Sequence, residues 1–250
     1  MGAGLRAGAR PDPQGSIAVT RGVAVVTGAR GGIGRAVVAQ LLDRGYSVVA
    51  HSRHVIVDLP SGVVSLSGDL SDPATAGHVH DAVERVDLLV NNAASQVVGP
   101  LDSLTASSWT DMLGETFLSA VHLSTALRPL MPRGASVINV TSIEAGSAFP
   151  NHAHYAASKA ALEAFTRSAA LEWAPGGIRV NAIAPGLVDR PGLAEEWPEG
   201  WAWWQRTCPL GRAIRPSEVA EAVVFLASSS GVSGVVLPVD GGWSASARLG

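Results

Sequence analysis

The sequence contains few cysteines, lysines, aromatic residues and charges, and each shortage excludes some classes of protein. Cys208 is the one cysteine among 250 residues, so no disulfide can form within the chain, and a reducing, cytoplasmic compartment is expected. Charged residues make up 16% of the chain and the formal net charge is −3, so the charge gives no reason to expect nucleic acid or an anionic membrane as a partner. No apolar run approaches the length of a membrane span, and with 47% hydrophobic residues we expect a globular chain.

Residues 1–21 differ in composition from the rest of the chain. They are rich in Gly, Ala, Arg and Pro and lack the continuous apolar centre of a secretory signal. We interpret them as a flexible extension, with a targeting peptide as the less favoured alternative. Residues 22–250 are expected to form one domain.

Lysine is scarcer than any other basic residue, because Lys159 is the one lysine among 18 arginines and lysines. A chain that uses arginine at every other such position indicates that a guanidinium cannot replace the compact ammonium at this one. Chance retention at a surface position is the alternative.

Short apolar runs rich in β-branched residues alternate with stretches of helical pattern. Such runs are typical of strands buried on both faces, and the alternation predicts parallel βαβ units with right-handed crossovers. We therefore expect an α/β fold with one doubly wound parallel sheet of about seven strands and helices on both faces. The expected strands are 22–27, 47–51, 62–66, 86–91, 136–141, 178–184 and 235–239, two expected helices are 34–44 and 155–173, and residues 53–63 leave room only for a loop.

A glycine-rich turn follows the first expected strand. Glycine permits a tight turn and a close approach of the backbone to a pyrophosphate, and the next helix directs its free N–H groups and positive dipole end at that anion. The strand–turn–helix context therefore favours a Rossmann-type nucleotide site over a glycine-rich connection without a ligand. The residues of the turn are Thr27, Gly28, Ala29, Arg30, Gly31, Gly32, Ile33 and Gly34.

The end of the second expected strand indicates which dinucleotide binds. An acid there would hydrogen-bond the adenosine ribose and favour NAD, but this chain has Ser52 followed by Arg53. Together with Arg30, they predict a site for the ribose 2′-phosphate of NADP(H); two solvent-facing arginines are the alternative. Further cofactor contacts are expected from Asp69 and Leu70 at the adenine edge and from residues 91–94, Asn91 and Ala93 among them, on the cofactor floor.

Tyr155 and Lys159 lie four residues apart in an Ala-rich helical stretch, so their side chains share one face of the helix. A nearby ammonium favours the phenolate, and we expect it to lower the pKa of Tyr155 towards neutrality, as a general acid requires. Ser142 follows another expected strand at the carboxyl edge of the sheet, where its hydroxyl could hold a substrate oxygen. A surface Tyr–Lys pair is the alternative, but the one lysine and one of only two tyrosines fall in the same unit.

From residue 22 to residue 243 the chain resembles the short-chain dehydrogenase/reductase family. The matching motifs are a TGxxxGxG turn at 27–34, an NNAG-like stretch at 91–94 that ends in Ala94, the Ser142–Tyr155–Lys159 triad, a Pro185–Gly186 pair, and the stretches 209–212 and 240–242. The resemblance implies a catalytic domain at 22–250, with Lys159 at the nicotinamide ribose and the backbone from Pro185 to Val188 at the nicotinamide. It also implies a homodimer or homotetramer, to which the small alanines of the helix at 155–173 are suited, and no metal site is expected.

Two positions depart from the family pattern. Thr116 stands where the family has an asparagine that holds a water in a proton relay to the lysine, and a hydroxyl offers fewer kinds of partner than an amide. Arg190 stands where the family has a threonine against the cofactor, and it could reach a pyrophosphate or a substrate carboxylate.

The favoured function is NADPH-dependent reduction of a ketone or aldehyde to an alcohol, or the reverse reaction. Tyr155 is the expected proton donor, Ser142 orients the carbonyl, and Lys159 tunes Tyr155. A non-redox lyase, cyclase or epimerase on the same scaffold is one alternative, because the departures from the family pattern at Thr116 and Arg190 are compatible with it. A non-catalytic nucleotide sensor is another, and the complete Ser–Tyr–Lys set argues against it.

The expected substrate is a small molecule that is bulky and apolar, and aromatic or polycyclic. Residues 187–207 hold four of the seven tryptophans and predict a mobile lid in which Trp203 and Trp204 contact the substrate. Packing of these rings on the core or on a second subunit is the alternative. Gln96 and Glu144 are further candidate substrate contacts, and His152 and His154 flank the same predicted pocket.

Overall fold

The computed structural model of the chain describes residues 10–11, 17–18 and 21–246. The flexible extension predicted for residues 1–21 lies outside these ranges, apart from Arg21 and two short strands. These strands, β1 (Arg10–Pro11) and β2 (Ile17–Ala18), pair antiparallel. The extension therefore stays a prediction.

Seven parallel strands form one sheet in the order β5-β4-β3-β6-β7-β8-β9. Every residue of β3, β4, β6 and β7 is buried, as expected for central strands of a parallel sheet covered on both faces. The predicted doubly wound sheet of seven strands is confirmed. The strands are β3 (Gly22–Thr27), β4 (Tyr46–Ser52), β5 (Val64–Ser67), β6 (Leu88–Asn91), β7 (Ser136–Val140), β8 (Arg179–Pro185) and β9 (Val236–Val239).

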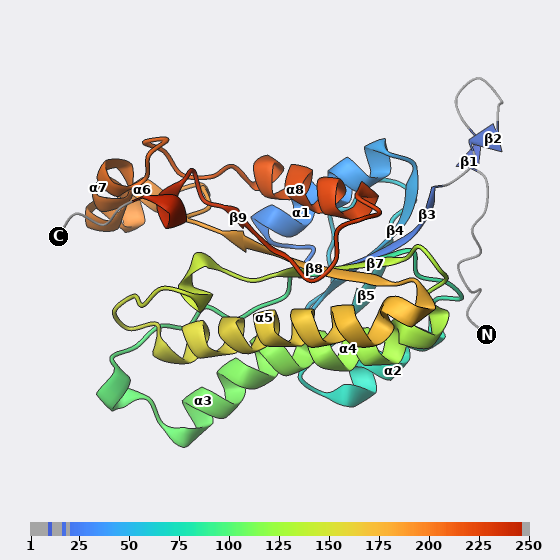
Figure 1. The fold of residues 1–250 in the computed structure, drawn as a ribbon, viewed down its shortest axis with the longest axis horizontal. Helices are drawn as coiled ribbons and strands as arrows, with labels where there is room; N and C mark the ends of the chain where they lie inside the picture. Colours follow the sequence, from blue (N-terminus) through green and yellow to red (C-terminus); the bar gives the residue numbers. More distant parts are fainter. Residues whose placement is uncertain (1–9, 12–16, 19–20, 247–250) are drawn as a thin grey trace.

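Helices cover both faces of the sheet (Figure 1). On one face α1 (Gly32–Asp43) and α8 (Pro216–Ser228) pack together over one apolar core. On the other face α2 (Pro73–Asp81), α4 (Ser119–Leu127) and α5 (Ala153–Trp173) cover a second core. None of the described helices is both long and apolar enough to cross a lipid bilayer.

Shorter elements complete the chain. A π-helical turn, η2 (Gly114–Leu118), joins α3 (Ala106–Leu113) to α4. Helices α6 (Leu193–Glu196) and α7 (Pro198–Thr207) follow the carboxyl end of β8. The 3₁₀ turns are η1 (Leu101–Ser103), η3 (Arg128–Leu130), η4 (Ile143–Ala145), η5 (Ala174–Gly176) and η6 (Trp243–Ala245).

The strand order reverses between β3 and β6, because the chain runs outward from β3 to β5 and then returns to β6. The crossovers on the two sides of this point lie on opposite faces, so the loops at the carboxyl ends of β3 and β6 separate and leave room for a ligand. As predicted, residues 53–63 between β4 and β5 contain no helix.

Buried hydrogen bonds join the sheet to α4 and α5. Asn91 Nδ2, at the end of β6, donates to Ser124 Oγ on α4 at 2.9 Å and to Asn139 Oδ1 on β7 at 2.8 Å. Asn139 Nδ2 in turn donates to Thr166 Oγ1 on α5 at 2.9 Å. Because buried hydrogen bonds are costly to break, they hold α5 and its site residues against the sheet.

Candidate active site

A cavity of about 1140 Å³ opens at the carboxyl ends of the strands, where the strand order reverses. Four of the predicted site residues, Gly34, Ser52, Asn91 and Thr116, are not part of its wall. The others are brought together from distant parts of the sequence. They are Gly28, Arg30, Gly31, Gly32, Ile33, Arg53, Asp69, Leu70, Ala93, Gln96, Ser142, Glu144, Tyr155, Lys159, Pro185, Gly186, Val188, Trp203 and Trp204.

The glycine turn has a shape that side chains would fill. Gly28 has a φ of +62°, and a Cβ there would lie 2.8 Å from Asn92 Nδ2. A Cβ on Gly34 would lie 2.3 Å from the carbonyl oxygen of Gly28, so Gly34 serves the close packing of helix on turn instead of lining the cavity. Thr27 Oγ1 accepts the backbone N–H groups of Asn92 and Ala93 at 2.9 Å each, which ties the turn to the end of β6.

The first turn of α1 fits a pyrophosphate. No side chain caps the helix at Gly31, and no acidic residue lies in its first turn. Its free N–H groups and positive dipole end therefore have no anionic partner among the described residues, and Gly31, Gly32 and Ile33 lie on the cavity wall. The residues present thus fit the dinucleotide that the sequence predicts.

Arg53 lies at the adenosine end of the cavity and is held by two carboxylates. Its Nη2 lies 2.8 Å from Glu115 Oε1 and its Nε lies 3.6 Å from Asp69 Oδ2. The guanidinium has five N–H donors, so Nη1 stays available for an anion. Arg30, within the glycine turn, is exposed and also lines the cavity.

The expected role of Ser52 at the ribose does not match its orientation. Its hydroxyl donates to the carbonyl oxygen of His54, and the residue is not on the cavity wall. The preceding residue, His51, is on the wall instead, because neighbouring side chains of a strand point to opposite faces. Neither ring nitrogen of His51 has a hydrogen-bond partner among the described residues, and burial lowers its pKa to about 4. His51 is therefore neutral, with both nitrogens unsatisfied.

The cofactor floor also lacks one of its expected residues. Asn91 is a core residue of the hydrogen-bond network that joins β6, β7 and α4, which corrects its predicted contact with the cofactor. Asn92 lies on the cavity wall, and its Nδ2 donates to the carbonyl oxygens of Thr27 and Gly28 at 3.0 and 3.2 Å. At the adenine edge Asp69 accepts the N–H of Ser71 at 2.9 Å, and this hydrogen bond is the main cause that lowers the pKa of Asp69.

Ser142, Tyr155 and Lys159 meet on one wall of the cavity. Ser142 follows β7, and Tyr155 and Lys159 lie on successive turns of α5. All three are buried, and the Ser142 hydroxyl is close enough to the Tyr155 phenol to affect its pKa. Lys159 Nζ donates to the carbonyl oxygen of Val140 at 2.7 Å and lies 5.6 Å from the centre of the Tyr155 ring.

Burial controls the protonation of this group. It raises the pKa of Tyr155, the nearby Glu144 carboxylate raises it further, and the Ser142 hydroxyl opposes both. Burial also lowers the pKa of Lys159 to about 8, while the Glu144 carboxylate acts in the opposite direction. The prediction that Lys159 lowers the pKa of Tyr155 towards neutrality is therefore wrong here, because desolvation of the phenol outweighs any attraction from the ammonium.

Thr116 is shut off from the cavity, which corrects its predicted place in a proton relay. It is fully buried in the π-helical turn η2. Its hydroxyl donates to Met112 Sδ at 3.4 Å and accepts the N–H of Ser95 at 3.2 Å. The hydroxyl proton is thus used inside the protein, and the chain holds no water-binding amide at this position.

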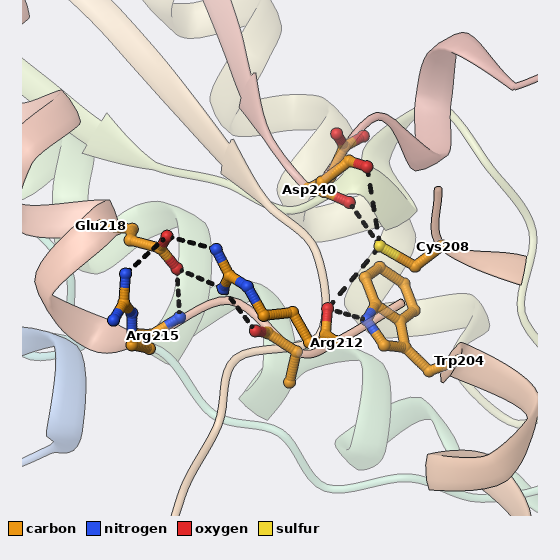
Figure 2. A network of polar contacts seen from close by, with 8 residues as sticks. Trp204, Cys208, Arg212, Arg215, Glu218 and Asp240 are labelled. Carbon is orange, nitrogen blue, oxygen red and sulfur yellow. Dashed lines mark hydrogen bonds and ion pairs between the residues drawn. The ribbon is translucent and has the colours of Figure 1, made fainter. Parts of the chain in front are cut away.

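Trp204 is anchored as a structural part of the wall (Figure 2). Its Nε1 donates to the carbonyl oxygen of Arg212 at 3.0 Å, and its ring stacks on Trp243 with 6.1 Å between centroids. The buried thiol of Cys208 lies beside it, with Sγ 3.4 Å from the carbonyl oxygen of Asp240. These contacts correct the prediction of a mobile lid at Trp204, since a ring fixed in this way packs the segment onto the core.

Trp203 forms the part of the cavity wall next to Trp204. Its ring packs edge-to-face on Phe149, with 5.9 Å between centroids, and both residues line the cavity. Trp197 also lines the cavity, whereas Trp201 packs behind the wall. Arg190, which departs from the family pattern, pairs with Glu196 at 2.6 Å on an exposed part of the same segment.

Several wall residues were not predicted as site residues. His51 adjoins the predicted Ser52, and strand alternation was the available signal for it. Glu115 and Phe149 have no local signal, because only the folded chain brings them to Arg53 and Trp203. His152, which was expected to flank the pocket, lies on the wall and pairs with Glu144.

A parallel sheet with an uncapped helix at its switch point and a buried Tyr–Lys pair is the architecture of a nucleotide-dependent oxidoreductase. Comparisons with known proteins agree. A family model described as enoyl-(acyl carrier protein) reductase matches residues 28–244. An uncharacterized short-chain type dehydrogenase/reductase of Sinorhizobium fredii is 39% identical over 246 residues, which cover 88% of this chain and 43% of that protein. This chain therefore spans less than half of that relative.

Two further relatives are matched over nearly their whole length. The cis-4-hydroxycyclohexanecarboxylate dehydrogenase of Sinomonas cyclohexanicum is 36% identical, over 89% of this chain and 96% of that protein. The solved structure of Thermoplasma acidophilum aldohexose dehydrogenase superposes with a TM-score of 0.85 at 30% identity, over 92% of this chain and 97% of that one. The chain belongs to the short-chain dehydrogenase/reductase family, as its motifs predict. It is accordingly an oxidoreductase of a family that uses a nicotinamide cofactor.

Proposed function

We propose that the protein interconverts a ketone or aldehyde and an alcohol with NADP(H). The observation that carries this proposal is the buried Ser142–Tyr155–Lys159 group on the wall of a cavity that also contains the glycine turn. Burial raises the pKa of Tyr155, so the phenol carries its proton at neutral pH, which is the protonation state that a proton donor needs.

The protein residues position the carbonyl and move the proton. Ser142 and Tyr155 hold the substrate oxygen between two hydroxyls, and the Tyr155 hydroxyl proton passes to that oxygen as it becomes an alkoxide. Lys159, with a pKa lowered to about 8, can exchange a proton with its surroundings near neutral pH and so assist the return of a proton to Tyr155. The hydride comes from the reduced nicotinamide ring of the bound cofactor.

Arg53 and Arg30 support a preference for NADP(H) over NAD(H). Both line the cavity at the end of β4 and in the glycine turn, and no acid occupies the last position of β4. Glu115 and Asp69 use two nitrogens of Arg53 and fix the plane of its guanidinium, which leaves Nη1 for the 2′-phosphate. Asp69 and Leu70 at the adenine edge, Ala93 on the floor, and Pro185, Gly186 and Val188 by the nicotinamide are the further proposed cofactor contacts.

An aromatic wall supports a bulky, largely apolar substrate. Phe149, Trp203 and Trp204 form it, with Gln96 as a polar neighbour on the cavity wall. The names of two relatives, a hydroxycyclohexanecarboxylate dehydrogenase and an aldohexose dehydrogenase, support chemistry at a carbon that bears an oxygen.

Exposed apolar side chains support the proposed homodimer or homotetramer. Leu171 on α5 and Phe225 on α8 are 79% and 56% exposed, and they lie on helices that cover opposite faces of the sheet. Pairing of each helix with its copy would bury them. A cytoplasmic location stays a prediction that rests on the single cysteine.

The test is a panel assay that follows the absorbance of reduced nicotinamide. NADPH is mixed with the protein and with aryl ketones, aliphatic ketones and an enoyl thioester, the last being the substrate type named for the matching family model. Steady NADPH oxidation with aryl ketones is expected. Oxidation with the enoyl thioester alone, product formation without oxidation, or NADPH binding without any product would each contradict the proposal, and would indicate double-bond reduction, a non-redox enzyme or a sensor, respectively.

A further inference from the structure

A carboxylate and an imidazole form a nearly buried pair beside Tyr155. Glu144 lies in η4, two residues after Ser142, and His152 precedes α5. Glu144 Oε2 lies 2.6 Å from His152 Nδ1, and only 11% of the Glu144 side chain and 23% of the His152 side chain are exposed. Carboxylates are rarely buried to this extent without a full set of partners. The pair has no capping role, because the His152 side chain does not cap α5.

One oxygen and one nitrogen of the pair are left for a ligand. Both residues line the cavity, and within residues 21–246 neither Glu144 Oε1 nor His152 Nε2 has a hydrogen-bond partner. When Nδ1–H is donated to the carboxylate, the neutral imidazole presents Nε2 as an acceptor. The pair thus offers two neighbouring acceptors, which select a ligand group that donates hydrogen bonds.

The surrounding charges favour a neutral donor over a cation. Burial raises the pKa of Glu144, and both the hydrogen bond with His152 and the attraction of Lys159 oppose this. The Lys159 ammonium therefore already balances much of the negative charge, and it would repel a second cation in the same cavity. An alcohol hydroxyl donates without bringing a charge.

The position of the pair relates this hydroxyl to the reacting carbonyl. The backbone N–H of Glu144 donates to Ser142 Oγ at 3.2 Å, and the His152 and Tyr155 rings pack edge-to-face with 6.3 Å between centroids. The pair is thus directly beside the two hydroxyls proposed to hold the carbonyl oxygen. Phe149 also stacks on His152, with 6.5 Å between centroids, and it belongs to the aromatic part of the wall.

We propose that Glu144 and His152 bind a hydroxyl group on the carbon next to the reacting carbonyl, so that the substrate class is an α-hydroxyketone with an apolar ring. The inference rests on the proposed function, because it concerns the same cavity and the same reaction. The two residues determine specificity; Tyr155 transfers the proton. In the reverse direction the corresponding substrate is a vicinal diol.

The experiment compares two ketones of similar size that differ in the donor. α-Hydroxyacetophenone has the hydroxyl, whereas α-methoxyacetophenone keeps the oxygen but lacks the hydrogen. With NADPH, kcat/KM for the hydroxyketone is expected to exceed that for the methoxyketone about tenfold or more, as one hydrogen bond from the hydroxyl to a charged pair implies.

Two variants assign this preference to the pair. In Glu144→Gln the amide can still accept from His152 but has lost its charge, and in His152→Phe the ring that stacks on Phe149 is kept without its nitrogens. Each is expected to lower the hydroxy-to-methoxy ratio about fivefold or more. Glu163→Gln, a matched change on α5 outside the cavity wall, is expected to keep the ratio of the parent protein.

Each outcome of this experiment supports or overturns the inference. Equal kcat/KM values for the two ketones in the parent protein would overturn the inference and leave the proposed function standing. A preference that both variants retain would also overturn it, because another residue would then bind the hydroxyl. Absence of NADPH oxidation with either ketone and with the whole panel would overturn the proposed function and the inference together.

Discussion

Substitution of Gly34 by alanine tests the packing of the glycine turn against α1. The added Cβ would lie 2.3 Å from the Gly28 carbonyl oxygen and 2.7 Å from Ala29 Cα, and neither backbone atom can rotate away. Overpacking of this kind costs about 3 kcal/mol or more, and alanine returns at most about 1 kcal/mol through its helix propensity. We therefore expect Gly34→Ala to lower the free energy of unfolding by about 2 kcal/mol and Tm by roughly 4–8 °C.

Gly32→Ala is the matched control, two residues earlier in the same helix. Its Cβ would lie 3.6 Å from Pro216 Cγ, which is an ordinary van der Waals contact. Its stability is expected to equal that of the parent protein or exceed it by up to about 1 kcal/mol. Urea unfolding followed by circular dichroism measures both variants. Equal stabilities of the two variants would refute the reasoning, because the backbone contact would then not limit the turn.

Three further predictions concern the site. Lys159→Met is expected to abolish turnover but to raise the free energy of unfolding at pH 7 by up to about 3 kcal/mol, since burial lowers the pKa of Lys159 from 10.5 to about 8. The folded chain binds fewer protons than the unfolded one between these values, so the cost of the buried charge, and with it the gain from Met, fades as the pH rises from 8 to 10.5. Arg53→Ala is expected to weaken NADPH binding about tenfold or more and to leave NADH binding nearly unchanged. Trp204→Phe is expected to cost about 1–3 kcal/mol, because the carbonyl of Arg212 loses its donor, whereas Trp197→Phe, at a ring that is 44% exposed, costs less.

Each of these has a measurement that can contradict it. A pH-independent gain in Lys159→Met, from urea unfolding at several pH values, would show that the ammonium is not destabilising. Equal losses of NADPH and NADH affinity in Arg53→Ala, from fluorescence titrations, would place Arg53 away from the 2′-phosphate. Equal costs for the two tryptophan variants would show that the Arg212 hydrogen bond does not anchor α7.

The sheet could be predicted because its signal is local. Central strands buried on both faces need continuous apolar runs, and the runs at residues 22–27 and 136–141 have no other explanation in a chain of this composition. The Tyr155–Lys159 pair was equally visible, since four residues along a helix return a side chain to the same face. Spacing along one element is therefore enough to bring these residues together.

Side-chain direction at the strand ends could not be predicted as well. Ser52 was expected on the wall, but its neighbour His51 lines the cavity; of the expected residues 91–94, Asn91 is absent from the wall. A strand reverses its side-chain direction at every residue, so an uncertainty of one residue in the end of a strand exchanges the core for the cavity.

Properties that depend on contacts between residues far apart in the sequence could not be predicted either. The pKa of Tyr155 is raised by burial, and the depth of burial follows from the packing of the whole site. Thr116 is closed off by Ser95 and Met112, and Trp204 is anchored by the carbonyl of Arg212. No motif marks Ser95 or Met112, and the motif at 209–212 does not indicate that Arg212 would meet Trp204.

The Tyr155→Phe variant tests the central claim most directly, because it removes the proposed proton donor and keeps the ring. Its counterpart is Tyr46→Phe, which changes the other tyrosine of the chain, outside the cavity wall. With NADPH and an aryl ketone, kcat/KM of Tyr155→Phe is expected to fall by about 10²–10⁴-fold while NADPH affinity stays close to that of the parent protein, and Tyr46→Phe is expected to keep its activity. If Tyr155→Phe retained most of its turnover, Tyr155 would not be the proton donor and the account would be wrong.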